Sequence, residues 1–315
     1  MEKRLVAADV CVGGEYMKHY KIQDQTLVAL IEQPFKLEKE IQSIFENNLM
    51  FLTGLELVKS EFTIKNNRID TLAFDPESQA FVIIEYKRER NYSVVDQGFT
   101  YLNLMLEYQA NFVIAYNEYL NKNLKLKDID WSQSRILFVS PHFTDFQKQS
   151  TNFKDIGIEL WEVERFENGI LSINKIKKSK ESPSLKQLQS IQSPIIQNIT
   201  QNIVQYDEDY HLANRSDDIK ELYEQFRDSI LNLAPDIEMN IRKNYIAFKC
   251  KNSNLLYVHF FKDFIRFDIS EQRKKLIDDP RNFFKDVVDG NYFAVKVKDS
   301  ENLEYILSLI KQTLK

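Results

Sequence analysis

The alternation of hydrophobic and polar positions divides the first part of the chain into a helix and several strands. Residues 37–50 repeat apolar side chains at helical spacing and predict an amphipathic helix. Residues 55–65 alternate with the period of a strand, and the pair at 66–67 is typical of a tight turn into a second strand at 68–74. The predicted helix therefore precedes a hairpin.

A run of large apolar and β-branched residues at 80–87 indicates a central strand that is buried on both sides. At 93–108 the apolar side chains return to helical spacing and predict a helix. The elements expected after it are a strand near 112–116, a strand at 135–140, a helix near 143–154 and strands at 157–166 and 170–176. This order predicts an α/β domain over residues 37–176, with a mixed sheet flanked by helices.

Two further segments flank this predicted domain. Residues 1–36 form an N-terminal extension, in which a short helix at 25–32 would end before Pro34. Residues 177–206 are first basic and polar and then rich in Gln, Asn and Ser, which is typical of an interdomain linker with some helix in 184–192. The alternative is that 177–206 is a surface loop of one large domain.

The last part of the chain, residues 207–315, has the pattern of a second, smaller α+β domain. A length of 315 residues fits two domains at roughly 150 residues each. The elements predicted here are a helix at 217–232, strands within 239–251 and 255–270, a turn at Asp279 and Pro280, a helix at 281–287, a strand at 292–297 and a closing helix at 301–314.

Composition narrows the chemistry that these domains can carry. The chain is 43% hydrophobic and 28% charged, so it can bury globular cores. Two cysteines exclude a disulfide framework and a cysteine-based zinc site, and they favour reduced thiols in the cytoplasm. The four histidines are scattered, so any metal would be held by carboxylates, which favours Mg²⁺ or Mn²⁺.

Charge and hydropathy limit the partners and the cellular location that we expect for this chain. The net charge of −5 counts mildly against a non-specific nucleic-acid binder. No run of 18 apolar residues is present, and the first residues lack the continuous apolar run of a signal peptide. We therefore expect a cytoplasmic protein that does not interact with a membrane.

One group of charged residues falls on the most strand-like segments. Asp70 lies in the predicted strand at 68–74, and Glu85 and Lys87 lie in the strand at 80–87. Because side chains alternate along a strand, Glu85 and Lys87 share a face. Burial of these charges is costly unless they pair with each other or bind a cation.

Such a group suits phosphodiester cleavage. Two carboxylates at neighbouring strand ends, Asp70 and Glu85, can chelate a divalent cation that polarises the phosphate and helps to deprotonate water. Lys87 can orient or help to activate the attacking water and offset charge on the phosphorus. The main-chain carbonyl of Tyr86 is a candidate for a further ligand.

The spacing Asp70-x14-Glu85-x-Lys87 resembles the core of the PD-(D/E)xK nuclease superfamily. Gln97 and Tyr101 resemble the QxxxY motif of its RecB-like subgroup. The string RIDTLAFD…VIIEYKR is similar to archaeal and bacterial nucleases that act on mismatched or branched DNA. The resemblance implies a restriction-endonuclease-like fold, a Mg²⁺ or Mn²⁺ site, and a role for Gln97 in orienting that site.

The same resemblance implies a catalytic glutamate on the preceding helix. Glu38 is the first choice, as an additional metal ligand or a water-positioning group. Glu46 can also reach the site, whereas Glu40 would face elsewhere. Ile69 stands where the superfamily has a proline. The C-terminal run SENLEYILSLIKQTLK, after DDPRNFFKDV, is similar to a bacterial domain of unknown function that accompanies such nucleases.

Each of these residues also has a purely structural interpretation. Asp70 can be a strand-end residue satisfied by Arg68 or by backbone amides. Glu85 and Lys87 can form an ion pair on a half-exposed face. Glu38 can be an exposed residue favoured by the helix dipole.

The nucleic-acid contacts implied by this interpretation are basic and aromatic residues near the site. They would hold the phosphate backbone or stack on bases. The basic residues after the third strand can equally form a solvated turn, and Gln97 and Tyr101 can be polar surface. The candidates for these contacts are Arg68, Arg88, Arg90 and Tyr101.

The favoured function is a divalent-metal-dependent phosphodiesterase, a DNA endonuclease of repair or anti-phage defence. The alternative is a catalytically silent or partner-gated module that binds nucleic acid or protein on a nuclease scaffold. The acidic composition favours this alternative, and the intact Asp, Glu and Lys set opposes it. RNA is a further substrate alternative. The C-terminal domain is expected to bind the target, a protein partner or a second copy of the chain.

Overall fold

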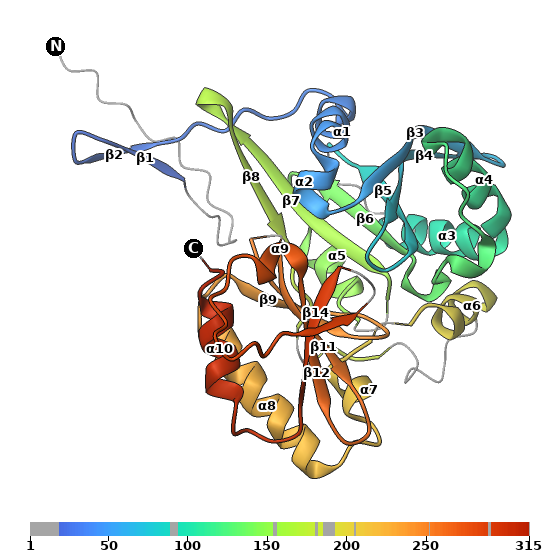
Figure 1. Ribbon diagram of the computed structural model, residues 1–315. Helices are drawn as coiled ribbons and strands as arrows, with labels where there is room; N and C mark the ends of the chain where they lie inside the picture. The colour runs from blue at the N-terminus through green and yellow to red at the C-terminus, as the bar shows by residue number, and fades with distance from the viewer. Residues whose placement is uncertain are drawn as a thin grey trace.

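The computed structural model describes residues 19–88, 94–153, 156–179, 182–184, 193–204, 206–251, 253–288 and 291–314. These residues form two six-stranded sheets, each with its own helices, and a two-stranded hairpin near the N-terminus (Figure 1). Separate clusters of buried side chains fill the two parts. No helix in the described ranges is long and apolar enough to cross a membrane.

The first sheet is mixed, with the strand order β3-β4-β5-β6-β7-β8. Strands β3 to β5 are antiparallel, β5 to β7 are parallel, and β8 returns antiparallel to β7. This confirms the predicted α/β fold with a mixed sheet. The bounds are β3 (Glu56–Ile64), β4 (Asn67–Asp75), β5 (Ala80–Tyr86), β6 (Arg135–Ser140), β7 (Ile158–Phe166) and β8 (Ile170–Lys175).

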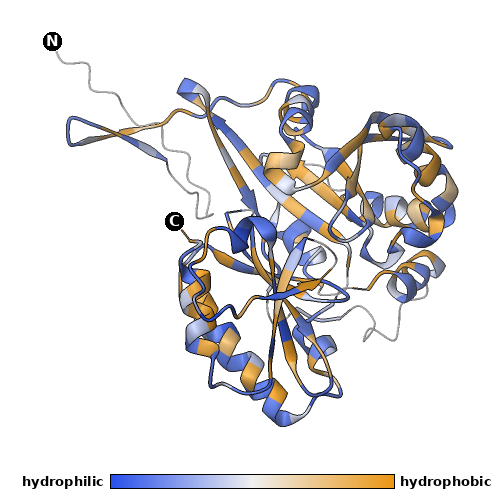
Figure 2. Cartoon of the chain, in the orientation of Figure 1, coloured by the Kyte–Doolittle hydropathy of each residue, from blue (hydrophilic) through white to orange (hydrophobic). Residues whose placement is uncertain are grey.

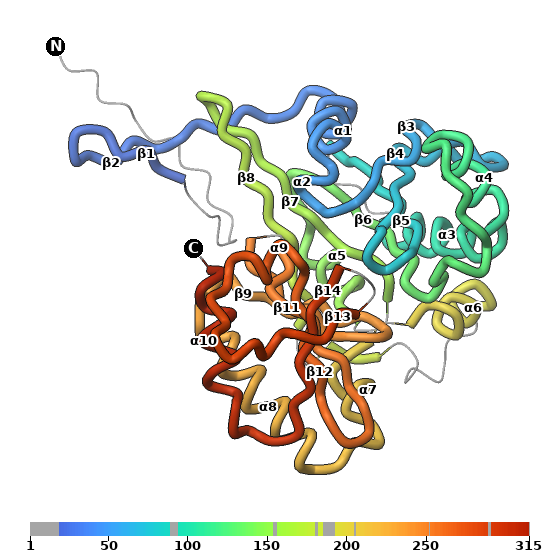
Figure 3. Tube along the Cα trace, in the orientation of Figure 1, coloured from blue at the N-terminus to red at the C-terminus, as the bar shows by residue number. Residues whose placement is uncertain are grey.

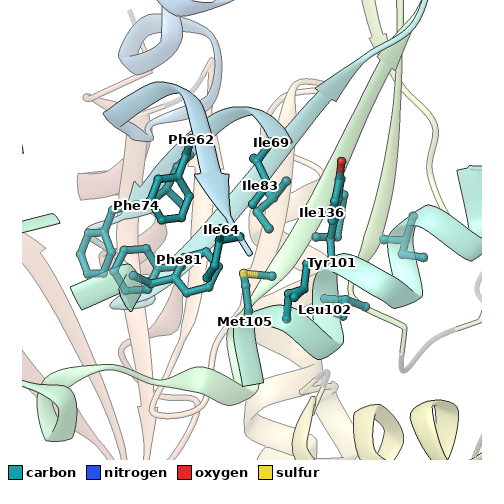
Figure 4. Close-up of a cluster of buried hydrophobic side chains, with 14 of the residues drawn as sticks. Phe62, Ile64, Ile69, Phe74, Phe81, Ile83, Tyr101, Leu102, Met105 and Ile136 are labelled. Atoms are coloured by element: carbon teal, nitrogen blue, oxygen red, sulfur yellow. The ribbon is translucent and has the colours of Figure 1, made fainter. Parts of the chain in front are cut away.

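Helices cover both faces of this sheet. The two helices before the sheet, α1 (Glu38–Asn47) and α2 (Leu49–Thr53), pack on one face, where Ile41, Phe45 and Leu49 are buried. Helices after β5 supply the core of the other face, part of which Figure 4 shows between the strands and α3. Those helices are α3 (Val94–Glu107), α4 (Gln109–Leu120) and α6 (Pro194–Asn202), and the short helix α5 (Asp145–Ser150) contacts α3.

The second sheet is fully antiparallel, with the order β13-β14-β12-β11-β10-β9. The apolar faces of α8 and α10 share one core with it, and Figure 2 shows both helices as mixtures of hydrophobic and hydrophilic positions. This confirms a second, smaller α+β domain. The bounds are α7 (Glu208–Leu212), α8 (Asp217–Leu231), β9 (Ile237–Ile241), β10 (Ile246–Cys250), β11 (Ser253–Phe260), β12 (Ile265–Ser270), α9 (Glu271–Lys274), β13 (Asp286–Val288), β14 (Tyr292–Val297) and α10 (Leu303–Lys311).

The strand predicted near 112–116 is wrong, because these residues lie in helix α4. Its buried residues Phe112, Val113 and Tyr116 follow helical spacing, and Asn121 ends the helix in the left-handed conformation. A short apolar run does not by itself distinguish the period of a helix from that of a strand. Three single turns of 3-10 helix also occur, at Leu126–Asp128, Trp131–Gln133 and Glu167–Gly169.

The short helix predicted at 25–32 is also wrong. Strands β1 (Tyr20–Gln23) and β2 (Thr26–Ala29) form a hairpin instead. Asp24 and Gln25 both have positive φ angles, 48° and 64°, as a two-residue hairpin turn requires. The turn therefore decides the local structure, although neither residue is a glycine.

The helix predicted at 281–287 is the third error. Asp279 Oδ2 accepts a hydrogen bond from the main-chain N–H of Phe284 (3.1 Å), and its Oδ1 accepts one from the Tyr305 hydroxyl (3.0 Å). These contacts hold the segment as a loop that buries Phe284 and leads into β13. The turn at Asp279 and Pro280 thus extends further than the sequence suggests.

Helix α6 lies within the stretch that composition suggested as a linker. It packs against α3, and Ile199 and Ile203 are fully buried in the core of the first sheet. The C-terminal part of 177–206 therefore contributes to the first core. Most of the helix suggested at 184–192 lies outside the described residues.

An ionic network joins the turn between β4 and β5 to the second sheet. Asp75 is 3% exposed, and its Oδ2 lies 2.9 Å from Arg135 Nη2 and 3.2 Å from Arg242 Nη2. In the same turn, Glu77 Oε2 lies 2.8 Å from Lys249 Nζ. Burial alone would raise the pKa of Asp75, but Arg135 and Arg242 hold it well below its usual range.

We expect Arg242→Met to lower the free energy of unfolding by about 1–3 kcal/mol at pH 7, because it leaves Asp75 with one guanidinium. A carboxylate with a lowered pKa stabilises the fold fully above its ordinary value of 3.8 and progressively less as the pH falls below it. The deficit should therefore shrink below about pH 4. Thermal unfolding from neutral to acidic pH measures it, with the exposed Lys243→Met as control. An equal loss in both variants would contradict the assignment.

Candidate functional site

The candidate site lies where β4 and β5 separate. The last pair of their ladder on this side is Thr71 with Ile84. Beyond it, Asp70 Oδ2 accepts a hydrogen bond from the main-chain N–H of Tyr86 (3.0 Å), while Tyr86 pairs with Val139 of β6. A carboxylate thus replaces the neighbouring strand as acceptor. The sheet opens at this point without leaving the N–H of Tyr86 unpaired.

Glu85 is the centre of a connected polar network. Its side chain is buried, and Oε1 accepts hydrogen bonds from Lys87 Nζ and Gln97 Nε2, both at 2.8 Å. Gln97 Nε2 also contacts the Tyr101 hydroxyl (3.0 Å), which donates to the main-chain oxygen of Arg68 (3.1 Å). The structure therefore brings together Glu85 and Lys87 of one strand segment with Gln97 and Tyr101 of α3.

The carboxylates of this site carry uncompensated charge. Glu85 Oε2 is buried and has no hydrogen-bond partner among the described residues. Burial, and then the charge of Glu85, raises the pKa of Asp70 to about 6. Burial and the same charge raise the pKa of Tyr101 to about 12, so its hydroxyl stays protonated. Glu85 and Asp70 are thus placed where a positive charge would be stabilised.

This donor set fits a hard divalent cation. Asp70 and Glu85 supply carboxylate oxygens, which Mg²⁺ and Mn²⁺ prefer. The described ranges contain no group of three or more His, Cys, Asp or Glu side chains arranged around one metal position. Two protein carboxylates are nevertheless enough for Mg²⁺, which keeps several water ligands and completes its shell with phosphate oxygens.

The glutamates of α1 contact different parts of the molecule. Glu38 Oε1 accepts a hydrogen bond from the main-chain N–H of Arg88 (3.1 Å), just after the strand segment of Glu85 and Lys87. Glu40 forms an ion pair with Arg165 (2.9 Å), away from this network. Glu38 thus positions the chain that leaves β5.

Glu46, with two further residues, supports β4 from the other face of the sheet. Gln42 is 3% exposed, and its Nε2 lies 2.8 Å from the main-chain oxygen of Asp70 and 2.9 Å from Glu46 Oε1. Glu46 Oε1 also accepts a hydrogen bond from the Thr71 hydroxyl (2.5 Å). Sequence reasoning missed Gln42 and Thr71. The sequence did contain a signal for Gln42, because this polar residue follows Ile41 on the apolar face of an amphipathic helix.

The candidate nucleic-acid contacts are only partly described. Arg68 is exposed and pairs with Glu61. The guanidinium of Arg88 donates to the main-chain oxygen of Lys36 (2.7 Å). Arg90 lies outside the described residues. Tyr101 is buried within the network around Glu85 and does not form an open stacking surface.

The fold and the site define an α/β protein with one buried and one half-buried carboxylate on a mixed sheet, joined to an antiparallel second domain. The chain is 50% identical over 304 residues to a protein of Haemophilus influenzae (strain ATCC 51907 / DSM 11121 / KW20 / Rd) described as "Uncharacterized protein". That similarity covers 95% of this chain and 100% of the relative, so the two belong to one family. Residues 208–313 match the family described as a domain of unknown function, DUF5655. This match bears out the expected C-terminal domain.

Two solved structures are similar to part of this chain. One is a repair endonuclease from Pyrococcus abyssi, with 21% identity and a TM-score of 0.25 over 42% of this chain and 49% of that chain. The other is the EndoMS-dsDNA2 complex, with 14% identity and a TM-score of 0.27 over 46% of this chain and 64% of that chain. Each similarity spans less than half of this chain and less than two thirds of the matched structure.

We expect Asp70→Asn to raise the stability of the metal-free protein at pH 8 by on the order of 1 kcal/mol, after allowance for solvent screening. A raised pKa means that the folded state takes up the proton first, so stability falls as the pH rises from about 4 to about 6. The gain from Asp70→Asn should therefore vanish below about pH 4. Thermal unfolding in EDTA measures it, with the exposed Asp96→Asn as control. A stability loss in Asp70→Asn at pH 8 would contradict this expectation.

Proposed function

We propose that this protein is a divalent-metal-dependent phosphodiesterase that cleaves DNA. The observation that carries the proposal is that the two oxygens of the Glu85 carboxylate have different surroundings. Its Oε1 is fixed by Lys87 and Gln97, while its Oε2 is buried without a partner among the described residues, beside the charge of Asp70. This arrangement costs stability unless a cation binds there.

Asp70 and Glu85 would hold Mg²⁺ or Mn²⁺, with the Tyr86 carbonyl as a further oxygen ligand. The bound cation would polarise the phosphate and lower the pKa of water. Lys87 Nζ lies 2.8 Å from Glu85 Oε1, where it can orient the attacking water and offset negative charge on the phosphoryl oxygens. Glu38 would complete this set, either as an additional ligand through water or by holding the segment after Lys87.

Gln97 would be a positioning residue. Its Nε2 donates a hydrogen bond to Glu85 Oε1 and contacts the hydroxyl of Tyr101, a residue of the same helix. That hydroxyl donates in turn to the main-chain oxygen of Arg68 in β4. Gln97 would then set the orientation of the Glu85 carboxylate without itself binding the metal.

The proposed substrate is DNA, as expected of an endonuclease of repair or anti-phage defence. Arg88 and Arg90 directly follow the strand that ends at the site, where basic side chains can hold the phosphate backbone. RNA is also tested as a substrate, because no contact in the described residues identifies or excludes a 2′-hydroxyl.

We expect Glu85→Gln to abolish metal-dependent cleavage, and Lys87→Met to reduce its rate by about 10²–10⁴-fold. The assay uses linear duplex, supercoiled plasmid, single strand, flap and mismatch DNA, and RNA. Each substrate is incubated with Mg²⁺, with Mn²⁺ and with EDTA. The substrate that is cut names the substrate class.

The matched control is Asp96→Asn, which removes an exposed carboxylate from the helix that carries Gln97. Its cleavage should equal that of the wild type. Cleavage that persists in EDTA, or in both Glu85→Gln and Asp70→Asn, would overturn the proposal.

We expect Gln97→Ala to lower kcat by about 10–100-fold while metal binding persists, because it frees the Glu85 carboxylate to rotate. Single-turnover cleavage at saturating Mn²⁺ and metal titration by calorimetry separate the two effects. The control is Thr100→Ala, an exposed residue of the same helix. Equal kcat in Gln97→Ala and in the wild type would remove Gln97 from the site.

A specific observation favours the alternative of a silent or partner-gated scaffold. Lys87 already pairs with Glu85, so part of the negative charge that would attract a cation is compensated within the chain. Calorimetry with Mg²⁺ and Mn²⁺ distinguishes the two functions. Absence of binding by the wild type favours the scaffold, and binding that is lost in Glu85→Gln favours the enzyme.

A further inference from the structure

A cavity of about 380 Å³ lies between the two domains, which Figure 3 shows one above the other. Three segments that are far apart in the sequence line it, namely the turn between β4 and β5, the loop that precedes β6, and the turn between β9 and β10. The cavity adjoins the ion pair of Asp75 with Arg242, at the end of the hairpin opposite Asp70 and Glu85. It is therefore separate from the candidate metal site.

The size and position of this cavity suit a small molecule. Ligand cavities commonly measure about 300–1,000 Å³, and they often lie between domains. This cavity is at the small end of that range. It can therefore enclose one small molecule, but not a segment of folded protein or of double-stranded DNA.

Cations from both domains line the cavity without a partner. Lys127 comes from the loop before β6, and Lys243 comes from the turn between β9 and β10. Both are exposed, and neither side chain forms a hydrogen bond or an ion pair with another described residue. Arg242 beside them binds Asp75 through Nη2, while its Nε is buried without a hydrogen-bond partner among the described residues. A buried charged donor without a partner is costly, so a ligand that supplies an acceptor would be stabilised here.

The carboxylates of the lining, by contrast, are already bound within the chain. Glu77 Oε2 pairs with Lys249 Nζ at 2.8 Å. Asp128 Oδ2 and Asp130 Oδ1 each accept a hydrogen bond from a main-chain N–H of their own turn (3.1 Å). The cations, rather than the carboxylates, are thus left to a ligand, and this favours an anion.

The wall of the cavity also offers an aromatic ring in a fixed position. Tyr245 lines the cavity, and its ring lies edge to face with Tyr257, at 5.2 Å between the ring centroids, and 5.6 Å from the ring of His259. The side-chain amides of Gln79 and Asn244 are part of the same lining. An aromatic ring can stack on a nucleobase, and amides can form hydrogen bonds with the edge of a base.

We propose that this cavity binds a nucleoside monophosphate, with the phosphate at Lys127, Lys243 and Arg242 and the base beside Tyr245. Lysine and arginine are the usual partners of phosphate oxygens. The ligand would contact both domains at once. The proposal does not rest on the proposed cleavage of DNA, because the cavity and the candidate metal site share no residue among those described.

The test is calorimetry of the full chain in EDTA with the deoxynucleoside and ribonucleoside 5′-monophosphates. The matching nucleosides and inorganic phosphate serve as comparison compounds. We expect saturable binding of at least one monophosphate at concentrations below about 1 mM. Both comparison compounds should bind more weakly, because each lacks one half of the contacts.

The double variant Lys127→Met, Lys243→Met should raise the dissociation constant of that monophosphate about tenfold or more, because it removes two partners of the phosphate. The matched control is Lys125→Met, Lys262→Met, which removes the same charge from exposed lysines outside the cavity, one in each domain. Its affinity should equal that of the wild type. All four side chains are exposed, so thermal unfolding without ligand should be the same in both double variants and in the wild type. Glu85→Gln should bind the monophosphate as the wild type does, which separates this cavity from the candidate metal site.

Several outcomes would overturn the proposal. One is the absence of saturable binding by every monophosphate, and another is equally tight binding of inorganic phosphate or of the nucleoside alone. The proposal is also wrong if the cavity variant keeps the affinity of the wild type, or if the control variant loses affinity to the same extent. DNA cleavage without this binding would refute only this proposal, and this binding without DNA cleavage would leave it standing.

Discussion

The rest of the site depends on one constraint, which is the placement of the buried carboxylate of Glu85 beside the half-buried carboxylate of Asp70, where β4 and β5 separate. Glu85 is 4% exposed, and Asp70 beside it has a raised pKa. Charges in such a place need compensation from the chain, from a cation or from a proton. Lys87 and Gln97 satisfy one oxygen of Glu85, and the N–H of Tyr86 satisfies one oxygen of Asp70. The other oxygen of Glu85, Oε2, is left without a hydrogen-bond partner among the described residues.

The β4–β5 hairpin carries two different ionic sites at its two ends. At one end Asp70 lies beside another carboxylate, and at the other end Asp75 lies between Arg135 and Arg242. Since Arg242 belongs to the segment between β9 and β10, the second domain forms an ion pair with the hairpin that carries the site. This contact connects the DUF5655 domain to the end of the hairpin opposite the candidate site.

The sequence was sufficient for most of the fold because the decisive elements have strong periodicity. The continuous apolar run around Phe81 and Ile83 is found in a buried central strand, and Glu85 and Lys87 share a face because strands have a period of two. The errors have different causes. At α4 a short apolar run does not distinguish the period of a helix from that of a strand. At the β1–β2 hairpin a two-residue turn sets the conformation, and near Asp279 side-chain contacts from other segments do. The support of Asp70 by Gln42 is also tertiary, because these residues belong to α1 and β4, which are separated in the sequence by α2 and β3.

Asp70 and Asp75 show why motif spacing alone does not identify a functional carboxylate. They have the same side chain and lie on the same strand, but their pKa values move in opposite directions. Two guanidinium groups stabilise the Asp75 carboxylate, so this residue adds to stability when it is charged. Asp70 faces burial and the charge of Glu85, so its charged form reduces stability until a cation arrives. The two carboxylates of β4 therefore have opposite electrostatic roles in the free protein, and the proposed cation site uses Asp70, whose charge the chain does not offset with a guanidinium.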